Sequence, residues 1–229
     1  MPGVVIDLLV ADGAVGRHRD LLEIAENAGV RVSTAAAAAV AEVSDAVTPQ
    51  GIVALCQTVD VPLADALAGS PRLVVLCDQI RDPGNLGTVI RCADAFGADA
   101  VLVSRDSVDL YNAKTVRAST GSLFHLPVTI EVDLTDAVRH AREVGLQVYG
   151  TDAAAPSLID DLARSGELTR PVLWVLGNEA RGLPADRAAQ LDRLVGLPMY
   201  GRAESLNLST AAAVLLYATA SAQRAASER

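Results

Sequence analysis

Aromatic residues are scarce in this 229-residue chain, at 3% of the sequence, so alanine, valine and leucine must fill any core. Cysteine is also rare. Cys56, Cys77 and Cys92 form an odd set without C-x-x-C spacing, which excludes a disulfide framework and a cysteine-based zinc site. The three histidines are scattered without metal-ligand spacing. We therefore expect a protein of the reducing cytoplasm that binds no metal.

Basic residues are in deficit, because 19 Lys and Arg face 28 Asp and Glu and leave a net charge of −9. Proteins that coat nucleic acid without sequence preference rely on a dense basic surface, so the composition argues against that class. The acid is unevenly spread, with a net charge of −6 over residues 1–71 and −3 over residues 72–229.

One segment of the second range, residues 112–127, holds Lys114 and Arg117 among serines and threonines and contains no acid. Such a composition suits RNA phosphate, which binds cations and hydroxyl donors together. An ordinary solvated loop and helix would explain the same residues.

Long hydrophobic runs are missing as well. The longest stretch without a charge, residues 205–223, has the length to span a bilayer, but it contains many Ser, Thr, Asn and Gln side chains. It is typical of a buried, alanine-rich helix. The first residues lack the basic and long apolar regions of a signal peptide. We expect a cytoplasmic protein with no membrane partner.

The strands and helices predicted along the chain alternate, which indicates an α/β fold. From residue 72 onward, continuous apolar runs at 73–77, 100–103 and 172–176 are typical of strands buried on both faces of a mainly parallel sheet. Residues 1–57 predict a smaller α/β domain. The segment 58–71, with two prolines, Gly69 and Ser70, predicts a linker before a domain over 72–229.

Three polar loops follow predicted strands, where open α/β sheets hold their ligands. Residues 78–88 lead into a helix, predicted from Leu86, that Asn85 can cap and that carries Arg91. The simplest explanations are that Asn85 only caps the helix and that the Arg91 side chain is only solvated.

The second loop, residues 176–184, contains Glu179 between Gly177 and Gly182. The two glycines have the spacing of a phosphate-binding P-loop, but Leu183 and Pro184 stand where Lys and Ser or Thr are required. A P-loop is therefore excluded, and a structural turn would explain the glycines. Neither domain has a G-x-G-x-x-G after its first strand, so a dinucleotide site has little support.

The third loop, residues 197–209, opens the uncharged final helix. Ser205 or Asn207 as a helix cap is the simple explanation, but one cap does not account for Ser, Asn, Ser and Thr packed together. A helix start so rich in donors suggests a bound polar ligand. No G-x-S-x-G motif or Cys/His pairing indicates a covalent nucleophile.

Taken together, the loops resemble the three signature motifs of the SpoU/TrmH branch of the SPOUT class of RNA methyltransferases. The matches are D-x-x-x-D-P-G-N-L-G-T-x-x-R over 78–91, L-G-N-E-x-x-G-L over 176–183, and L-P-M-x-G-x-x-E-S-L-N-L-S over 197–209. The resemblance implies an α/β sheet with a C-terminal deep trefoil knot, an exception to the rule that chains do not thread loops. It also implies S-adenosylmethionine as cofactor, a homodimer packed partly through the last helix, and methylation of a ribose 2′-hydroxyl.

The resemblance also implies roles for single residues. Arg91 matches the arginine assigned to activate the 2′-hydroxyl, and because arginine stays protonated we favour electrostatic stabilisation over a role as base. The polar residues that organise the site match Asn85, Glu179, Ser205 and Asn207. The cofactor positions match Gly177, Asn178, Leu197, Met199 and Leu206. Arg117 and Lys114 are the candidates for RNA phosphate.

Residues 1–57 resemble the ribosomal-protein-like RNA-binding domain of many ribosomal-RNA members, without its usual opening helix and strand, so we expect a domain that is shortened or has an atypical start. The leading hypothesis is a ribose 2′-O-methyltransferase of structured RNA, with ribosomal RNA favoured over transfer RNA. The acidic first domain keeps open a second hypothesis, an RNA-binding or ribosome-assembly factor that has lost catalysis. A generic nucleotide-binding α/β enzyme has no motif in its favour.

Overall fold

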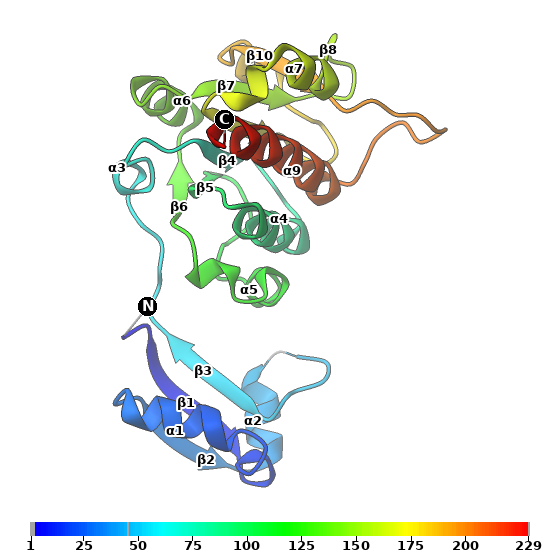
Figure 1. Cartoon of the computed structure of the whole chain (residues 1–229). Helices are drawn as coiled ribbons and strands as arrows, with labels where there is room; N and C mark the ends of the chain where they lie inside the picture. Colours follow the sequence, from blue (N-terminus) through cyan, green and yellow to red (C-terminus); the bar gives the residue numbers. More distant parts are fainter. Residues whose placement is uncertain (1–2, 45, 229) are drawn as a thin grey trace. The chain divides into compact units, whose positions relative to one another are not determined.

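The computed structural model describes residues 3–44 and 46–228, which divide into two compact units that meet at Val59 and Asp60 in the sequence. The first unit is a small three-stranded α/β unit (Figure 1). Its elements are β1 (Val5–Ala11), a 3-10 turn (Asp12–Ala14), α1 (Arg19–Asn27), β2 (Arg31–Ala35), α2 (Ala37–Ser44) and β3 (Ile52–Cys56).

The sheet of the first unit has the order β2-β1-β3, with β1 parallel to β2 and antiparallel to β3. Two small apolar clusters hold it. In one, Leu22 of α1 packs with Leu8 and Val10, and in the other Val40 of α2 packs with Ala11. The α/β character predicted for this part of the chain is therefore present.

The second unit is built on seven strands in the order β6-β5-β4-β9-β7-β10-β8, and every pairing between neighbours is parallel. The central strands β4, β5 and β9 are buried over their whole length, because an apolar run without alternation can be covered on both faces. The strands are β4 (Leu73–Cys77), β5 (Ala100–Ser104), β6 (Val128–Val132), β7 (Gln147–Thr151), β8 (Ser157–Leu158), β9 (Val172–Leu176) and β10 (Arg193–Gly196).

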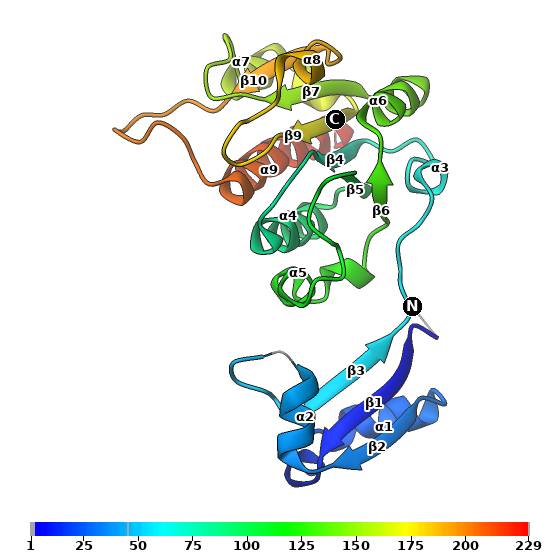
Figure 2. The ribbon, with the colours of Figure 1, turned by 180° about the vertical axis from the view of Figure 1, so that it is seen from behind.

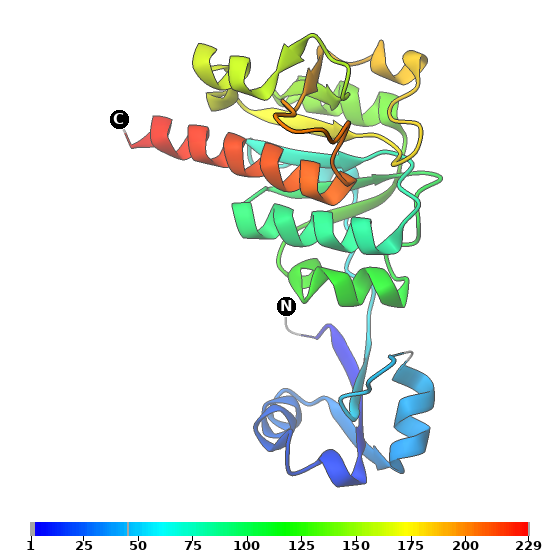
Figure 3. The same ribbon diagram turned by 90° about the vertical axis from the view of Figure 1, so that its right-hand side faces the viewer.

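Helices cover both faces of this sheet. They are α3 (Leu63–Ala66), α4 (Pro83–Phe96), α5 (Ala113–Ser119), α6 (Leu134–Glu143), α7 (Ile159–Ser165), α8 (Ala185–Ala188) and α9 (Leu208–Ser227), with 3-10 turns at Ser122–Phe124 and Glu167–Thr169. α3 and α6 pack with Val74 and Leu173 on one face. On the other face α9 contacts β4, and Thr219 accepts a hydrogen bond from Trp174 Nε1 at 3.0 Å. Figure 3 shows α9, α4 and α5 stacked in front of the strands.

Residues 60–71, which fall within the linker predicted over 58–71, belong instead to the second unit. Ala66 and Leu67 are 4% and 2% exposed and join the core beside α6. The Val61 N–H donates to the carbonyl of Val128 at 2.9 Å, so the segment also adds to the β6 edge. Its prolines suggest a linker, but Leu63, Ala66 and Leu67 form an apolar stripe that the short helix α3 buries.

Helix α4 begins three residues before the start at Leu86 predicted from the sequence. Pro83 occupies its first turn and Asp82, rather than Asn85, is the N-cap, accepting from the Asn85 N–H at 2.8 Å. The Asn85 side chain is therefore available for other contacts. The predicted stop at Gly97 is present, with the left-handed φ of +72° that suits glycine.

The final helix starts at Leu208, and Asn207 is its N-cap, as one of the two simple explanations predicted. None of the helices over 3–44 and 46–228 combines the length and hydropathy that crossing a bilayer demands. The α/β class with a mainly parallel sheet is confirmed, while the trefoil knot stays a prediction.

Candidate active site

A cavity of about 320 Å³ lies at the carboxyl edge of the large sheet, beside the ends of β7, β9 and β10. Figure 2 shows the loop after β9 and the long segment between β10 and α9 on the same side of the second unit. Seven residues proposed from the sequence line this carboxyl-edge cavity. They are Gly177, Asn178, Glu179, Leu197, Met199, Ser205 and Leu206.

Ten of the seventeen lining residues were not proposed from the sequence, and Asp152, Leu183 and Glu204 are among them. Asp152 follows β7, so the position of a carboxylate just after a predicted strand is a signal that could have found it. Leu183 and Glu204 lie within the second and third motifs, but nothing in their spacing marks them as lining residues.

The three motif loops are joined by a chain of side-chain hydrogen bonds. Asn85 Nδ2 donates to Glu179 Oε1 at 3.1 Å, and Asn207 Nδ2 donates to Asn85 Oδ1 at 3.0 Å. Asn207 Oδ1 then accepts from the N–H groups of Ser209 and Thr210 at the start of α9. Hydrogen bonds are therefore donated in one direction along the chain, from the start of α9 to Asn207, then to Asn85 and finally to Glu179. This direction fixes the orientation of both amide groups.

Glu179 is held as a carboxylate by these donors. Burial opposes its ionisation, but hydrogen bonds from Asn85 and from the N–H groups of Arg81 and Asp82 outweigh burial and leave the pKa of Glu179 below its ordinary value. The two backbone N–H groups both donate at 3.2 Å. An ionised carboxylate only accepts, so it matches three donors converging on it.

The loop after β9 is a tight turn with no room for a larger residue at its start. A Cβ on Gly177 would lie 2.6 Å from the carbonyl carbon of Gly182, and the Gly182 N–H donates to the Asn178 carbonyl at 2.8 Å. The Asn178 side chain accepts from the Ala180 and Arg181 N–H groups and donates to the Gln79 carbonyl at 2.8 Å. Asn178 therefore organises the turn and ties it to the first motif.

At the first position of the first motif, Asp78 is 1% exposed and forms an ion pair with Arg187 of α8. Burial raises the pKa of Asp78, and the Arg187 guanidinium opposes this shift. A buried charge requires such a partner, so the pair ties the end of β4 to the chain that follows the second motif.

The three basic residues of the prediction are exposed on the surface. Lys114 Nζ contacts Asp82 Oδ2 at 2.9 Å, and the backbone N–H of Asp82 in turn donates to Glu179. Arg91 and Arg117 are exposed on α4 and α5 and do not line the cavity. The structure therefore brings together Asn85, Glu179 and Asn207, but not Arg91.

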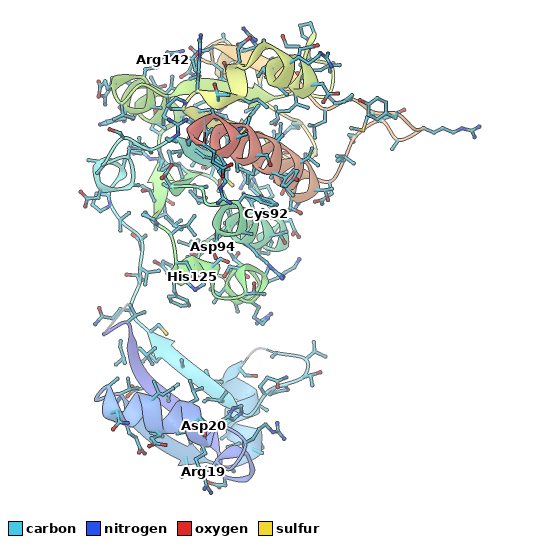
Figure 4. The ribbon with its side chains drawn as sticks, viewed as in Figure 1. Arg19, Asp20, Cys92, Asp94, His125 and Arg142 are labelled. Carbon is cyan, nitrogen blue, oxygen red and sulfur yellow. The ribbon has the colours of Figure 1, made fainter. Side chains whose placement is uncertain are left out.

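A further charged pair, which includes a residue of α4, lies outside the network. Asp94 of α4 and His125, both labelled in Figure 4, form an exposed pair with 2.8 Å between Oδ2 and Nδ1. The His125 hydrogen bond lowers the pKa of Asp94. Over residues 3–44 and 46–228, no group of three or more His, Cys, Asp or Glu side chains is placed to hold a metal ion.

This fold and site define an α/β protein with a ligand cavity at the carboxyl edge of a parallel sheet. The SpoU rRNA Methylase family model matches residues 72–217, and the chain belongs to this family. The family predicted from the three motifs is thus confirmed.

Named relatives extend the similarity across both units. The chain is 37% identical over 216 residues to the 23S rRNA (guanosine(2553)-2′-O)-methyltransferase RlmP of Bacillus subtilis, covering 94% of this chain and 81% of the relative. It is 34% identical over 207 residues to the 23S rRNA (guanosine-2′-O-)-methyltransferase RlmB of Nitrosomonas europaea, covering 89% and 78%. The crystal structure of the SpoU methyltransferase AviRb from Streptomyces viridochromogenes, in complex with the cofactor AdoMet, is 31% identical with a TM-score of 0.82, covering 97% and 84%.

Proposed function

We propose that this protein transfers the methyl group of S-adenosylmethionine to a ribose 2′-hydroxyl of ribosomal RNA. Family membership and the names of the two relatives support the reaction and its substrate class. The observation that carries the proposal is the hydrogen-bonded chain of Glu179, Asn85 and Asn207, which joins all three motif loops beside the cavity.

The cavity suits the cofactor that the AviRb complex holds. Leu183, Leu197 and Leu206 offer apolar surface for a flat ring, while Asp152 and Glu204 offer negative charge to a cationic ligand. A volume of about 320 Å³ is within the range of small-molecule sites. When bound, S-adenosylmethionine supplies an electrophilic methyl group on a sulfonium.

Arg91 is the proposed catalytic residue. Its guanidinium is permanently protonated, so its role is to stabilise the phosphate beside the reacting ribose and the alkoxide that develops on the 2′-oxygen. Asn85, Glu179, Ser205 and Asn207 position the ribose and the last turn before α9. The hydrogen bonds that join Asn85, Glu179 and Asn207 restrict the reacting geometry, which is a large part of catalysis when two substrates must meet in line.

Lys114 and Arg117 of α5 are proposed to bind RNA phosphate. Both side chains are exposed, and the Lys114–Asp82 pair is exposed enough for a phosphate to compete for the ammonium group. The contribution is local, because residues 72–229 as a whole carry a net charge of −3. RNA recognition is therefore expected to depend on shape, with modest affinity.

The protein is also proposed to act as a homodimer in the cytoplasm, without a metal ion. Val214 and Tyr217 expose 42% and 62% of their surface on α9, and a second copy of the chain would cover them. Metal assistance is unnecessary because a sulfonium methyl group is already electrophilic.

The test combines cofactor binding with site mapping. Calorimetry of the full chain with S-adenosylmethionine is expected to show binding, and ribose methylation mapped across total RNA of a deletion strain is expected to lose one ribosomal site. Binding without any lost site would favour an inactive assembly factor, which the acidic first unit keeps as the second candidate. Loss of a transfer-RNA site would identify a transfer-RNA enzyme instead.

A further inference from the structure

Negative side chains outnumber positive ones in the lining of the carboxyl-edge cavity. The cavity lining includes three carboxylates, Asp152, Glu179 and Glu204, and a single cationic side chain, Arg181. S-adenosylmethionine carries two cationic groups, a sulfonium and an ammonium, and one carboxylate. The lining is thus complementary in sign, with three acids toward two cations, and the single guanidinium has one matching group, the carboxylate.

We propose that Arg181 binds the carboxylate of the methionyl part of S-adenosylmethionine, an inference that rests on the function proposed above. A guanidinium donates two parallel hydrogen bonds to a carboxylate, and such charge-assisted pairs are about twice as strong as neutral hydrogen bonds. Arg181 occupies one of the two variable positions of the motif L-G-N-E-x-x-G-L, so the resemblance assigns it no role.

The backbone of Arg181 is fixed before any ligand arrives. Its N–H donates to Asn178 Oδ1 at 3.2 Å, inside the turn closed by the paired backbone hydrogen bonds of Asn178 and Gly182. Gly182 adopts a φ of +64°, which lets the chain reverse immediately after Arg181. The side chain therefore starts from a fixed point on the cavity wall, which lowers the entropy cost of binding.

The side chain itself is exposed and uncommitted. Arg181 forms no side-chain hydrogen bond or ion pair with any residue in 3–44 or 46–228, whereas Glu179 already accepts from Asn85, Arg81 and Asp82. Asp152 accepts one hydrogen bond, from the Ala154 N–H, and a carboxylate can accept several. Asp152 and Glu204 are therefore the acids available to the ammonium group.

An RNA phosphate is the competing source of an oxyanion for Arg181. The two sources separate when the cofactor is titrated without RNA. Calorimetry of the full chain would compare S-adenosylmethionine with decarboxylated S-adenosylmethionine, which lacks only the carboxylate, for wild type, Arg181→Ala and Arg181→Lys. Arg202→Ala is the matched control, because Arg202 is exposed in the next motif loop and does not line the cavity.

The Arg181→Ala change is expected to weaken S-adenosylmethionine binding about 10- to 100-fold, the usual range for a hydrogen-bonded charge. Decarboxylated cofactor should bind equally to wild type and Arg181→Ala, Arg181→Lys should recover part of the loss, and Arg202→Ala should behave as wild type. Equal losses for both ligands, or no loss for either, would overturn the assignment. An RNA affinity that falls while cofactor affinity holds would assign Arg181 to phosphate, whereas a wild-type chain that fails to bind the cofactor would instead overturn the proposed function.

Discussion

Asn85 decides how the three motif loops meet. Its amide stands between a carboxylate and a second amide, donating to Glu179 and accepting from Asn207. This double contact is possible because Asp82 caps α4 and leaves the Asn85 side chain free to turn toward the other loops. A residue of similar size without both a donor and an acceptor would break the chain at one end.

Replacing Arg91 separates chemistry from cofactor binding. Arg91→Ala is expected to reduce methylation at least about 100-fold, the scale of losing a donor that stabilises a developing oxyanion. Cofactor affinity should remain, because Arg91 does not line the cavity. Single-turnover methylation and calorimetry measure the two effects, and undiminished turnover would remove Arg91 from the mechanism.

Glu179→Gln tests the charge at the centre of the network. The pKa of Glu179 is lowered in the folded protein, so the stabilisation from its ionised form is present above the unfolded pKa and is lost as pH falls through the folded value. The melting temperature of Glu179→Gln should therefore be lower than wild type at pH 7, and the gap should close in acid. Glu23→Gln on exposed α1 is the control. A difference in melting temperature between Glu179→Gln and wild type that stayed constant across pH would contradict the conclusion that Glu179 is ionised.

At the scale of elements, α4 connects the site to its neighbours. Asp82 caps its start, accepts from Lys114 of α5 and donates its N–H to Glu179. The Lys114 and Asn85 hydrogen bonds lower the pKa of Asp82. The same short turn thus starts the helix and supports the Glu179 carboxylate.

Two substitutions at Asp82 separate the cap from the ion pair. Asp82→Ala removes both and is expected to cost about 1 kcal/mol of unfolding free energy, the usual value of an N-cap. Asp82→Asn keeps the cap and loses only an exposed ion pair, so its cost should be below about 0.5 kcal/mol. Urea unfolding measures both changes. Equal destabilisation by Asp82→Ala and Asp82→Asn would show that the ion pair with Lys114, rather than the helix cap, stabilises the fold.

At the scale of the whole molecule, the exposed face of α9 supports the proposed dimer. Tyr217 packs edge-on against Phe96, with 5.7 Å between ring centroids, yet leaves most of its surface exposed. Rings positioned but uncovered in this way are typical of interfaces.

Tyr217→Glu places a charge in that proposed interface. Sedimentation at micromolar concentration should show a dimer for wild type and a shift of at least tenfold in the dissociation constant for the variant, because burying an unpaired charge is costly. Tyr200→Glu serves as the comparison, since Tyr200 lies on the motif loop outside α9. A monomeric wild type would end the dimer proposal.

The sequence by itself determined the family and the α/β class, because both rest on local patterns. Apolar runs such as 73–77 require burial on both faces, and three motifs in one order specify three loops. From the same sequence, seven of the seventeen residues that line the cavity could be proposed, because all seven lie in the motifs that follow predicted strands.

Only the tertiary structure decided which side chains meet. Asn85 and Asn207 lie 122 positions apart, and their contact depends on how α4 and α9 begin at the edge of one sheet. Local patterns favoured Asn85 as a helix cap and residues 58–71 as a linker, but in the folded chain Asp82 is the cap and Leu67 is buried. For the few aromatic residues as well, the sequence predicts one property and the tertiary structure decides another. Their scarcity predicts an aliphatic core, but only the folded chain leaves Tyr217 exposed and buries Trp174.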